Sequence, residues 1–394
     1  MKKKLLFVIP SLDAGGAEKS LVNLLGVIDL EQYEVDVVLF NKSGIFLDML
    51  PDAVSVDEIA GTYRIFSQGI IPSVVQLMLR LNFWAALNRI VFAAKNKAYK
   101  NKAVGEQQSW KHVSSSIKPL EKKYDAAIGY LEKSSIYFVV DKVNAAKKIG
   151  WIHTNYSNSG MDAGFDAPYF AKLDNIVTVS DECAASLESA FPSEKKKISI
   201  IHNIVSSEII FRLAQSGKAT ELSEGKINII SVGRLSPEKG FALAVETCAT
   251  LMKKGIDAYW FLIGEGSEMP MLKAKIAELG LQDRFHLIGA KPNPYPYVAK
   301  ASVYVQPSQY EGKSMAIDEA KILGKPLVVT NFSTVKDQIK DGENGLVSEM
   351  NPESLANAII KITTDEILRK RLVENLKSEN LTTEQEVNKL YRLL

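Results

Sequence analysis

Residues 309–329 read QYEGKSMAIDEAKILGKPLVV and place two glutamates, Glu311 and Glu319, eight positions apart. The preceding run VYVQPS predicts a buried strand that ends at Ser308, and a helix is predicted to begin near Ser314. Glu311 then lies in the turn and Glu319 on about the second turn of the helix. The apolar neighbours of Glu319 predict that it is buried, and a buried carboxylate needs a hydrogen-bond partner. Sugar and ribose hydroxyls are suitable donors, whereas two solvated glutamates are the alternative.

The turn between the two glutamates, Gly312 to Met315, offers backbone N–H groups at the start of the predicted helix. Amides at a helix N-terminus attract phosphate. The stretch can therefore hold a sugar at Glu311, a phosphate in the turn and a ribose at Glu319.

Composition limits the class of protein. The chain has 394 residues, more than one typical core, so we expect two domains. Its formal net charge of +2 argues against a protein that coats nucleic acid. Cys183 and Cys248 lie far apart and form no C-x-x-C pair, which indicates a reducing cytosol and no structural zinc. The start, MKKKLLFVIP, lacks the cleavage pattern of a signal peptide, and no apolar run reaches the ~18–20 residues that span a bilayer.

Sequence patterns typical of strands and of helices alternate along the chain. KKLLFVIP, a helical pattern over 17–28 and YEVDVVLF predict a strand–helix–strand unit with a parallel sheet. Further strands are predicted at 125–131, 147–154, 175–180 and 198–203 and, after the polar linker ELSEGK, at 226–235, 257–266, 284–290, 302–308 and 325–330. Two such runs joined near 205–225 predict two doubly wound domains, in which ligands lie beyond the carboxyl ends of the strands.

Residues 60–123 differ from the rest of the chain. From Arg64 to Lys123 there are 11 Lys or Arg and two Glu, and large apolar residues such as Trp84 and Phe92 are interspersed with the bases. This composition is typical of a helix that lies in an anionic membrane surface. The alternative is a helical insertion packed on the first sheet with a solvated basic face.

The stretch SVGRLSPEKGF at 231–241 carries two cations, Arg234 and Lys239, around a Ser-Pro turn that opens a helix. The pair favours a diphosphate, because Arg forms a bidentate fork and Lys supplies a point charge. A surface salt bridge is the alternative for either residue alone. An earlier glycine loop, Ser11–Gly16, lets the backbone approach a ligand closely. Neither a G-x-G-x-x-G fingerprint nor a P-loop is present, so a dehydrogenase or P-loop NTPase is unsupported.

Taken together, these motifs resemble those of the retaining glycosyltransferases of family 4. The resemblance covers nearly the whole chain and is strongest from 228 to 347. It includes SLDAGGAE, the pattern G-R-x-x-x-x-K-G from Gly233 to Gly240, the E-x7-E pair, and GKPLVVT, IGEGSE, LIGA and DGENGLV.

The resemblance implies an α/β chain of GT-B fold, with two Rossmann-like doubly wound domains facing across a cleft. The first domain would span 1–205 and carry the basic insertion at 60–123. The donor domain would span 206–375, and a C-terminal helix within 376–394 would return to the first domain.

The same resemblance implies a role for each matching residue. Arg234 and Lys239 would hold the donor diphosphate and stabilise charge on the leaving nucleotide, and Glu319 would bind the donor ribose. Glu311 would face the hydroxyls of the donor sugar. The other residues expected to touch the donor are Gly15, Gly16, Gly233, Gly289, Gly312, Lys313, Ser314 and Met315.

Three further positions bear on the resemblance. His153, at the end of the strand 147–154, matches a position where related enzymes often carry a His near the reacting sugar, although a lone His is usually structural. Ile204 follows Asn203 where the family usually reads N-G, which puts the usual turn in doubt. Lys313 stands where an aromatic or small residue is common.

The expected activity is retaining, metal-independent transfer of a sugar from a nucleotide-diphosphate sugar, preferably a UDP-sugar, without any cofactor. No D-x-D motif precedes a strand end, and Arg234 and Lys239 would take over the electrostatic role of a metal. The expected acceptor is a saccharide or a polyprenyl-linked sugar of cell-surface polysaccharide assembly. We expect a cytoplasmic protein, peripheral at the inner membrane face, with no nucleic-acid partner. The alternatives are a sugar-nucleotide epimerase or hydrolase, and a non-catalytic nucleotide-sugar-binding subunit.

Overall fold

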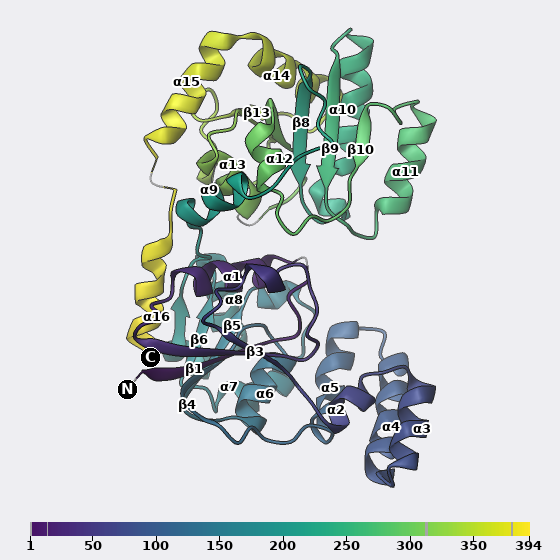
Figure 1. The fold of residues 1–394 in the computed structure, drawn as a ribbon, viewed down its shortest axis with the longest axis vertical. Coiled ribbons are helices and arrows are strands. Elements are labelled where there is room, and N and C mark those ends of the chain that lie inside the picture. The colour runs from purple at the N-terminus through teal and green to yellow at the C-terminus, as the bar shows by residue number, and fades with distance from the viewer. Residues whose placement is uncertain (1, 14, 312–313, 380) are drawn as a thin grey trace. The chain divides into compact units, whose positions relative to one another are not determined.

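Figure 1 shows the fold in a computed structural model that describes every residue except 1, 14, 312, 313 and 380. The chain forms two compact units. Unit 1 comprises Met1–Ile204 and Thr383–Leu394, and unit 2 comprises Val205–Thr382. Each unit contains one parallel sheet with a hydrophobic core on both faces.

Within the described residues, the sheet of unit 1 has seven strands in the order β3-β2-β1-β4-β5-β6-β7. Its central strands are nearly continuous apolar runs, because helices cover both faces of the sheet. The strand order reverses between β1 and β4, which makes that point the topological switch of unit 1. The strands are β1 (Lys3–Ile9), β2 (Tyr33–Leu39), β3 (Ser55–Glu58), β4 (Lys123–Gly129), β5 (Asn144–Ile152), β6 (Asn175–Thr178) and β7 (Ile198–Ile200).

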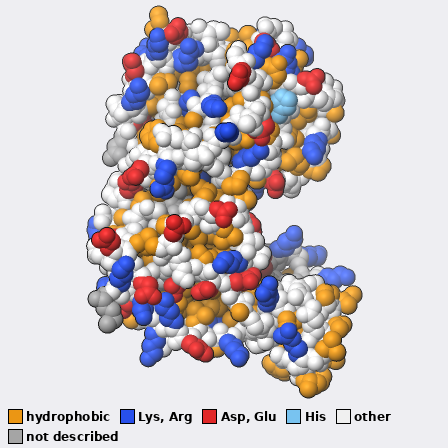
Figure 2. All heavy atoms as spheres, in the orientation of Figure 1, with side chains coloured by type: hydrophobic (Ala, Val, Ile, Leu, Met, Phe, Trp, Pro, Cys, Tyr) orange, Lys and Arg blue, Asp and Glu red, His pale blue; other side chains and the backbone are white. Residues whose placement is uncertain are grey.

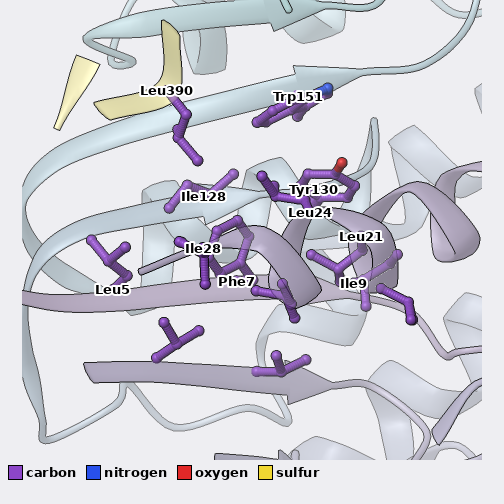
Figure 3. Close-up of a cluster of buried hydrophobic side chains, with 14 of the residues drawn as sticks. Leu5, Phe7, Ile9, Leu21, Leu24, Ile28, Ile128, Tyr130, Trp151 and Leu390 are labelled. Carbon is purple, nitrogen blue, oxygen red and sulfur yellow. The ribbon is translucent and has the colours of Figure 1, made fainter. Parts of the chain in front are cut away.

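Two cores hold the helices of unit 1 to this sheet. Figure 3 shows one of them, where Leu21 and Leu24 of α1 lie against Phe7 of β1 and Ile128 of β4. The other core lies around Phe138 and Tyr137 of α6. The helices are α1 (Gly16–Val27), α6 (Ser134–Lys142), α7 (Ala163–Phe170) and α8 (Asp181–Ala190), with short 3-10 turns η1 (Leu47–Met49), η2 (Tyr156–Asn158) and η3 (Pro192–Lys197).

The basic insertion folds into four helices, α2 (Thr62–Phe66), α3 (Ile70–Leu79), α4 (Phe83–Ala98) and α5 (Lys102–Ser114). Helix α5 joins the body of unit 1 through Trp110, which is buried and donates its indole N–H to Asp141 at 2.8 Å. Helix α3 packs on α4 around a small core that also contains Ile65, and α4 in turn packs on α5, where a ring nitrogen of His112 lies 2.7 Å from the Asn88 side-chain oxygen. Helix α5 therefore fits the expectation of an insertion packed on the body of unit 1, whereas α3 and α4 project from that body (Figure 1).

The chain ends in unit 1 with η6 (Glu384–Glu386) and α16 (Val387–Leu393). Leu390 is buried in the core that α1 also covers, as Figure 3 shows. Tyr391 stacks on Tyr33 with 5.2 Å between ring centroids, and its hydroxyl accepts the Asp29 N–H at 2.8 Å. These contacts fix the last residues on the first sheet, far in sequence from its strands.

The sheet of unit 2 has six strands in the described residues, in the order β10-β9-β8-β11-β12-β13. The order reverses at β8, which has β9 on one side and β11 on the other, so the switch point lies between β8 and β11. The strands are β8 (Ile227–Val232), β9 (Ala258–Ile263), β10 (Phe285–Leu287), β11 (Val303–Gln306), β12 (Leu327–Thr330) and β13 (Leu346–Ser348).

Helices cover both faces of this second sheet. Phe241 and Leu251 of α10 lie in one core, and Ile317 of α13 and Val298 of α12 lie in the other. The helices and 3-10 turns are α9 (Ser207–Gln215), η4 (Pro237–Lys239), α10 (Phe241–Lys253), α11 (Met269–Glu278), α12 (Tyr295–Lys300), α13 (Met315–Ile322), η5 (Val335–Asp337), α14 (Pro352–Thr364) and α15 (Glu366–Lys377).

The polar segment ELSEGK at 221–226 is not a linker between the units. It belongs to unit 2, where the Glu221 carboxylate accepts hydrogen bonds from Lys291 at 2.8 Å and from the Tyr297 hydroxyl at 2.7 Å. The change of unit comes before α9, whose Ile210 is buried in a cluster with Tyr295. Its polar composition suggested a linker, but Glu221 of this segment is paired with other side chains of unit 2.

Among the described residues, no helix is both long enough and apolar enough to cross a membrane.

Candidate active site

Two loops of unit 2 follow the strands on either side of its switch point. The first, Gly233–Gly240, leaves β8, and the second, which leaves β11, includes Pro307–Glu311 and Ser314. A backbone hydrogen bond from the Gln309 N–H to the Glu238 carbonyl, 2.8 Å long, joins them. Because ligands of doubly wound sheets bind beyond the carboxyl ends of strands at such points, this is where a donor site is expected.

The loops bring together two of the residues singled out from the sequence. The Lys239 ammonium lies 2.8 Å from each carboxylate oxygen of Glu311. Glu311 is 6% exposed and also accepts hydrogen bonds from the Ser308 hydroxyl at 2.7 Å and the Gln306 amide at 3.2 Å. The Thr334 hydroxyl binds the Glu311 backbone carbonyl at 2.7 Å. The carboxylate is therefore held in one orientation by donors from three side chains.

Arg234 follows Gly233 directly and is exposed. Within the described part of the chain, no hydrogen bond or ion pair engages its guanidinium group. Lys239 forms an ion pair with Glu311, whereas Arg234, on the same loop as Lys239, does not. An anion at the switch point would thus meet a guanidinium that does not first have to leave a protein partner.

Gly240 is required where the first loop enters α10. Its φ is +64°, a left-handed conformation, and an added Cβ would overlap with the carbonyl oxygen of Pro307 in the second loop. Any side chain at this position would both strain the backbone and push the two loops apart.

Three glycines meet at the carboxyl ends of β8, β9 and β10. The Gly233 N–H donates to Ile263 O, and the Gly264 N–H donates to Gly289 O, both at 3.0 Å. A Cβ on Gly264 would overlap with the Gly233 carbonyl oxygen. Gly233 and Gly289 therefore lie together at the carboxyl end of the sheet, where both are partly exposed.

Glu319 is buried in α13, with 3% of its surface exposed, as its apolar neighbours predict. Its carboxylate accepts a hydrogen bond from the Tyr295 hydroxyl at 3.2 Å. Burial and then the charge of Glu319 raise the pKa of Tyr295 well above its usual value, so the tyrosine stays a proton donor. The buried glutamate thus has a protein donor that its sequence context did not indicate.

The start of α13 is tied to a residue further along the chain. Gln338 accepts the Ser314 N–H at 2.8 Å and donates to the Ser314 carbonyl and to Asp318, each at 2.9 Å. A phosphate at the Ser314 amide would therefore have to replace Gln338. Met315 is the first residue of the helix, and Gly312 and Lys313 lie outside the described residues.

Gly15 and Gly16 lie in unit 1 at the start of α1, which Gly15 precedes as N-cap and Gly16 opens. The Glu18 carboxyl folds back over Gly15, so that an added Cβ would overlap with it. Next to an added Cβ on Gly16 there is open space. The Glu18 carboxyl can move aside and Gly15 has an extended backbone with a φ of −152°, so the local conformation does not require glycine there, and the backbone at Gly16 is accessible.

His153 also lies in unit 1, just after β5. Its ring packs against Tyr130 at 4.9 Å and stacks on Trp151 at 6.2 Å between centroids. Burial lowers the pKa of His153 to about 3, with a hydrogen bond to the Tyr130 backbone acting in the opposite direction. The imidazole is therefore neutral at physiological pH, and its buried Nε2 lacks a hydrogen-bond partner in the described residues.

A polar network missed from the sequence surrounds this histidine. The buried Glu132 carboxylate accepts a hydrogen bond from the backbone N–H of His153 at 3.4 Å, and burial raises the pKa of Glu132. The Ser20 hydroxyl lies 3.0 Å from the Tyr130 hydroxyl and donates to Asn203 at 2.8 Å. Asn203 thus keeps a fixed position although Ile204 replaces the usual glycine. Only the placement of these residues at the ends of β4 and β7 could have signalled the network.

Other residues at the unit 2 site were also missed: Gln306, Ser308, Gln338 and Tyr295. Ser308 had a usable signal, because it precedes Glu311 by three positions at the end of a strand. Gln338 and Tyr295 had none, since each acts on a residue more than 20 positions away. Within the described ranges, no group of three or more His, Cys, Asp or Glu side chains is arranged to hold a metal ion.

Comparison with known proteins identifies the second unit. Residues 215–379 match the family described as glycosyl transferases group 1, a range that contains Arg234, Lys239, Glu311 and Glu319. A relative from Campylobacter jejuni, N-acetylgalactosamine-N,N'-diacetylbacillosaminyl-diphospho-undecaprenol 4-alpha-N-acetylgalactosaminyltransferase, is 26% identical over 372 residues, 93% of this chain and 92% of that protein. The UDP-Gal:alpha-D-GlcNAc-diphosphoundecaprenol alpha-1,3-galactosyltransferase of Escherichia coli is 31% identical over 181 residues, 44% of this chain and 46% of that protein.

Among solved structures, the Anabaena protein Alr3699/HepE in complex with UDP-glucose is similar with a TM-score of 0.66 and 16% identity, covering 99% of this chain and 100% of that one. The chain spans 39%, 58% and 46% of the length of three curated relatives that it matches. The fold is GT-B, with two Rossmann-like units, as expected from the motifs. The match to the group 1 glycosyl transferases lies within the second unit, and the likeness to solved structures extends the GT-B fold over the whole chain.

Proposed function

We propose that this protein is a retaining, metal-independent glycosyltransferase. It moves a sugar from a UDP-sugar to a saccharide or polyprenyl-linked acceptor in the assembly of a bacterial surface polysaccharide. The observation that carries the proposal is the arrangement at the switch point of unit 2, where the exposed Arg234 lies on the same loop as Lys239, and Lys239 is paired with Glu311 of the second loop.

This arrangement suits the departure of a nucleoside diphosphate. The bond between the anomeric carbon and the phosphate oxygen breaks, and negative charge gathers on that phosphate. Arg234, and Lys239 after exchange of Glu311 for phosphate, would stabilise this charge as a metal does elsewhere. Removing one such preorganised donor typically costs ~10²–10³ in rate.

Other residues would bind the rest of the donor. Once Lys239 turns toward the phosphate, the Glu311 carboxylate is free to accept hydroxyls of the sugar. Glu319 would accept the ribose hydroxyls, the backbone at Gly289 would border the base, and the unpartnered Nε2 of His153 would accept a sugar hydroxyl. Each role uses an acceptor or a backbone segment described above.

Retention is proposed because the motifs resemble those of retaining enzymes. The acceptor oxygen would bond to the anomeric carbon from the face that the diphosphate leaves, and the acceptor proton would pass to the departing phosphate oxygen. The names of relatives support the choice of substrates, since one of them specifies UDP-Gal and two specify diphospho-undecaprenol acceptors.

The first test measures thermal stability of the full-length protein with UDP, GDP, ADP and their sugar conjugates in the presence of EDTA. A nucleotide at ~100 times its dissociation constant adds ~2.7 kcal/mol to the state that binds it. We expect a shift with the uridine series that is lost in Arg234→Ala. Lys273→Ala, which removes an exposed cation of α11, is the matched control and should keep the shift.

The outcomes separate the proposal from its alternatives. A shift that appears with none of the nucleotides, or only after a divalent metal is added, contradicts the donor site as proposed. Turnover of the donor without any acceptor identifies an epimerase or hydrolase, and tight donor binding with persistent inactivity identifies a non-catalytic subunit. An inverted anomeric configuration in the product, read by NMR, contradicts retention.

A further inference from the structure

The hairpin of α3 and α4 carries most of the exposed large apolar side chains of the protein. In the described part of the chain, ten of 17 such side chains fall within 21 consecutive residues. They are between 42% and 79% exposed and comprise Ile70, Ile71, Val75, Met78, Leu79, Leu81, Phe83, Trp84, Leu87 and Ile90. Figure 2 shows hydrophobic side chains gathered on the outer face of this lobe. Contiguous exposed apolar surface of this kind marks a binding surface.

The apolar face is exposed although the two helices have a core of their own. Leu77 of α3 and Ala85 and Ala86 of α4 are buried against each other and against Ile65. Arg89 closes this core: it donates to the Gln68 carbonyl at 2.8 Å and lies over the rings of Phe66 and Phe92 at 5.6 and 5.3 Å. The two helices therefore already have an internal packing face, and the ten residues form a second apolar face.

The turn between the helices keeps a large apolar residue in a strained conformation. Leu81 has a φ of +56° and is 75% exposed. Glycine or asparagine takes this left-handed conformation readily, whereas leucine pays a steric penalty in it. Hydrogen bonds from the Leu81 N–H to Met78 O and from the Asn82 N–H to Leu77 O end α3 in this conformation, and the leucine places an apolar side chain at the exposed tip of the hairpin.

The charges around this surface have one sign. No Asp or Glu occurs between Glu58 and Glu106, while the same segment carries seven Lys or Arg. Arg64, Arg80 and Lys97 are among those exposed. A second copy of this chain would bring an equally cationic rim against this one, which disfavours self-association. Anionic phosphate groups beside an apolar layer complement both features.

We propose that the α3–α4 hairpin docks this protein on an anionic phospholipid bilayer. Leu79, Leu81, Phe83 and Trp84 enter the layer between headgroups and acyl chains, and the surrounding bases contact lipid phosphates. Helix α4 has 16 residues, ~24 Å at 1.5 Å per residue, so the hairpin lies in the surface and does not cross the ~30 Å core. This proposal concerns the bilayer itself and does not depend on the proposed transferase activity.

The test is flotation of the full-length protein with vesicles of phosphatidylcholine alone and of phosphatidylcholine with phosphatidylglycerol. We expect binding to the anionic vesicles that weakens with added salt. Leu81→Gly should keep or raise thermal stability, because glycine fits the turn, and should bind the vesicles more weakly. The triple variant Leu79→Ser/Leu81→Gly/Trp84→Ser should bind the anionic vesicles at least about tenfold more weakly than the wild type. Ile367→Ser, which removes an 83% exposed side chain of α15, should bind as the wild type does.

Tryptophan fluorescence supplies an independent measurement. Trp84 is 68% exposed, whereas Trp110, Trp151 and Trp260 are buried, so a blue shift on anionic vesicles reports Trp84. Trp84→Phe should bind vesicles and show no shift. Failure to bind anionic vesicles, or equal binding by the triple variant, overturns the proposal. A wild-type dimer that the triple variant converts to monomer overturns it as well, because the surface then belongs to a second copy.

Discussion

Lys239 and Glu311 form an ion pair in which the ammonium lies 2.8 Å from both carboxylate oxygens. The residues are 72 positions apart and come from loops that follow β8 and β11. Each has a separate expected task, one with the donor diphosphate and the other with the donor sugar. Their pairing means that a donor must replace a protein contact, which couples binding of the phosphate to release of the carboxylate for the sugar.

The pair yields a prediction about stability. Lys239→Met leaves the Glu311 carboxylate, 6% exposed, without its cation, and should lower the free energy of unfolding by about 2 kcal/mol, less than a fully buried pair because Lys239 is partly exposed. Lys239→Met/Glu311→Gln removes both charges and should stay within about 1 kcal/mol of the wild type. Urea denaturation measures both values.

The control is Lys370→Met, which removes an exposed pair with Glu366 on α15. Its urea midpoint should equal that of the wild type, since such pairs contribute little. If the single and the double variant at 239 and 311 were equally destabilised, the loss would come from packing of the lysine stem and the pairing argument would fail.

The sequence predicted the central strands well because strands buried on both faces are continuous apolar runs. β3 and β13 were not predicted, since β3 alternates between exposed and half-buried residues and β13 has three residues. The motif residues were identified, but not the Lys239–Glu311 and Ser314–Gln338 contacts, because these depend on which loops the strand order brings together. The basic insertion was recognised by composition, which does not separate the inner from the outer apolar face of α3.

A second prediction concerns the contact between the two loops of unit 2. Gly240→Ala places a Cβ against the Pro307 carbonyl in a left-handed conformation and should cost about 3 kcal/mol of unfolding free energy. Gly225→Ala is a matched control, because Gly225 has a φ of +69° and open space around it. It should cost only the backbone strain, about 1 kcal/mol. Equal losses in thermal or chemical denaturation would show that Pro307 moves aside freely.

A third prediction tests the donor to Glu319. Tyr295→Phe removes a buried hydroxyl that binds the carboxylate and should cost about 1–3 kcal/mol in urea denaturation. Tyr297→Phe is the control: its hydroxyl binds Glu221, whose side chain is 35% exposed and also paired with Lys291, so less than about 1 kcal/mol should be lost.

The same two variants bear on the ribose. If Glu319 binds the ribose, Tyr295→Phe should also weaken UDP binding in calorimetry, because the carboxylate loses a group that orients it. Tyr297→Phe should leave UDP binding unchanged. Weakened binding in both would point to a general disturbance of α12 and against a specific role of the Tyr295–Glu319 contact.

The last prediction concerns pH. Burial lowers the pKa of His153 to about 3 from its ordinary 6.5, so the unfolded chain binds this proton at a pH where the folded protein does not. The stability that His153 contributes in its neutral form is full above about pH 6.5 and is lost as the pH falls toward 3. Between about pH 6.5 and 4.5 this loss amounts to roughly 2–3 kcal/mol.

His153→Phe keeps an aromatic ring beside Tyr130 and Trp151 and cannot be protonated. The variant should therefore lose less stability than the wild type over that range in urea denaturation at a series of pH values. Burial raises the pKa of the neighbouring Glu132, an effect of opposite sign that is common to both proteins and largely cancels in the comparison. Parallel pH profiles would mean that the His153 ring reaches water when it is protonated, and its proposed role as a neutral acceptor for a sugar hydroxyl would then have to be abandoned.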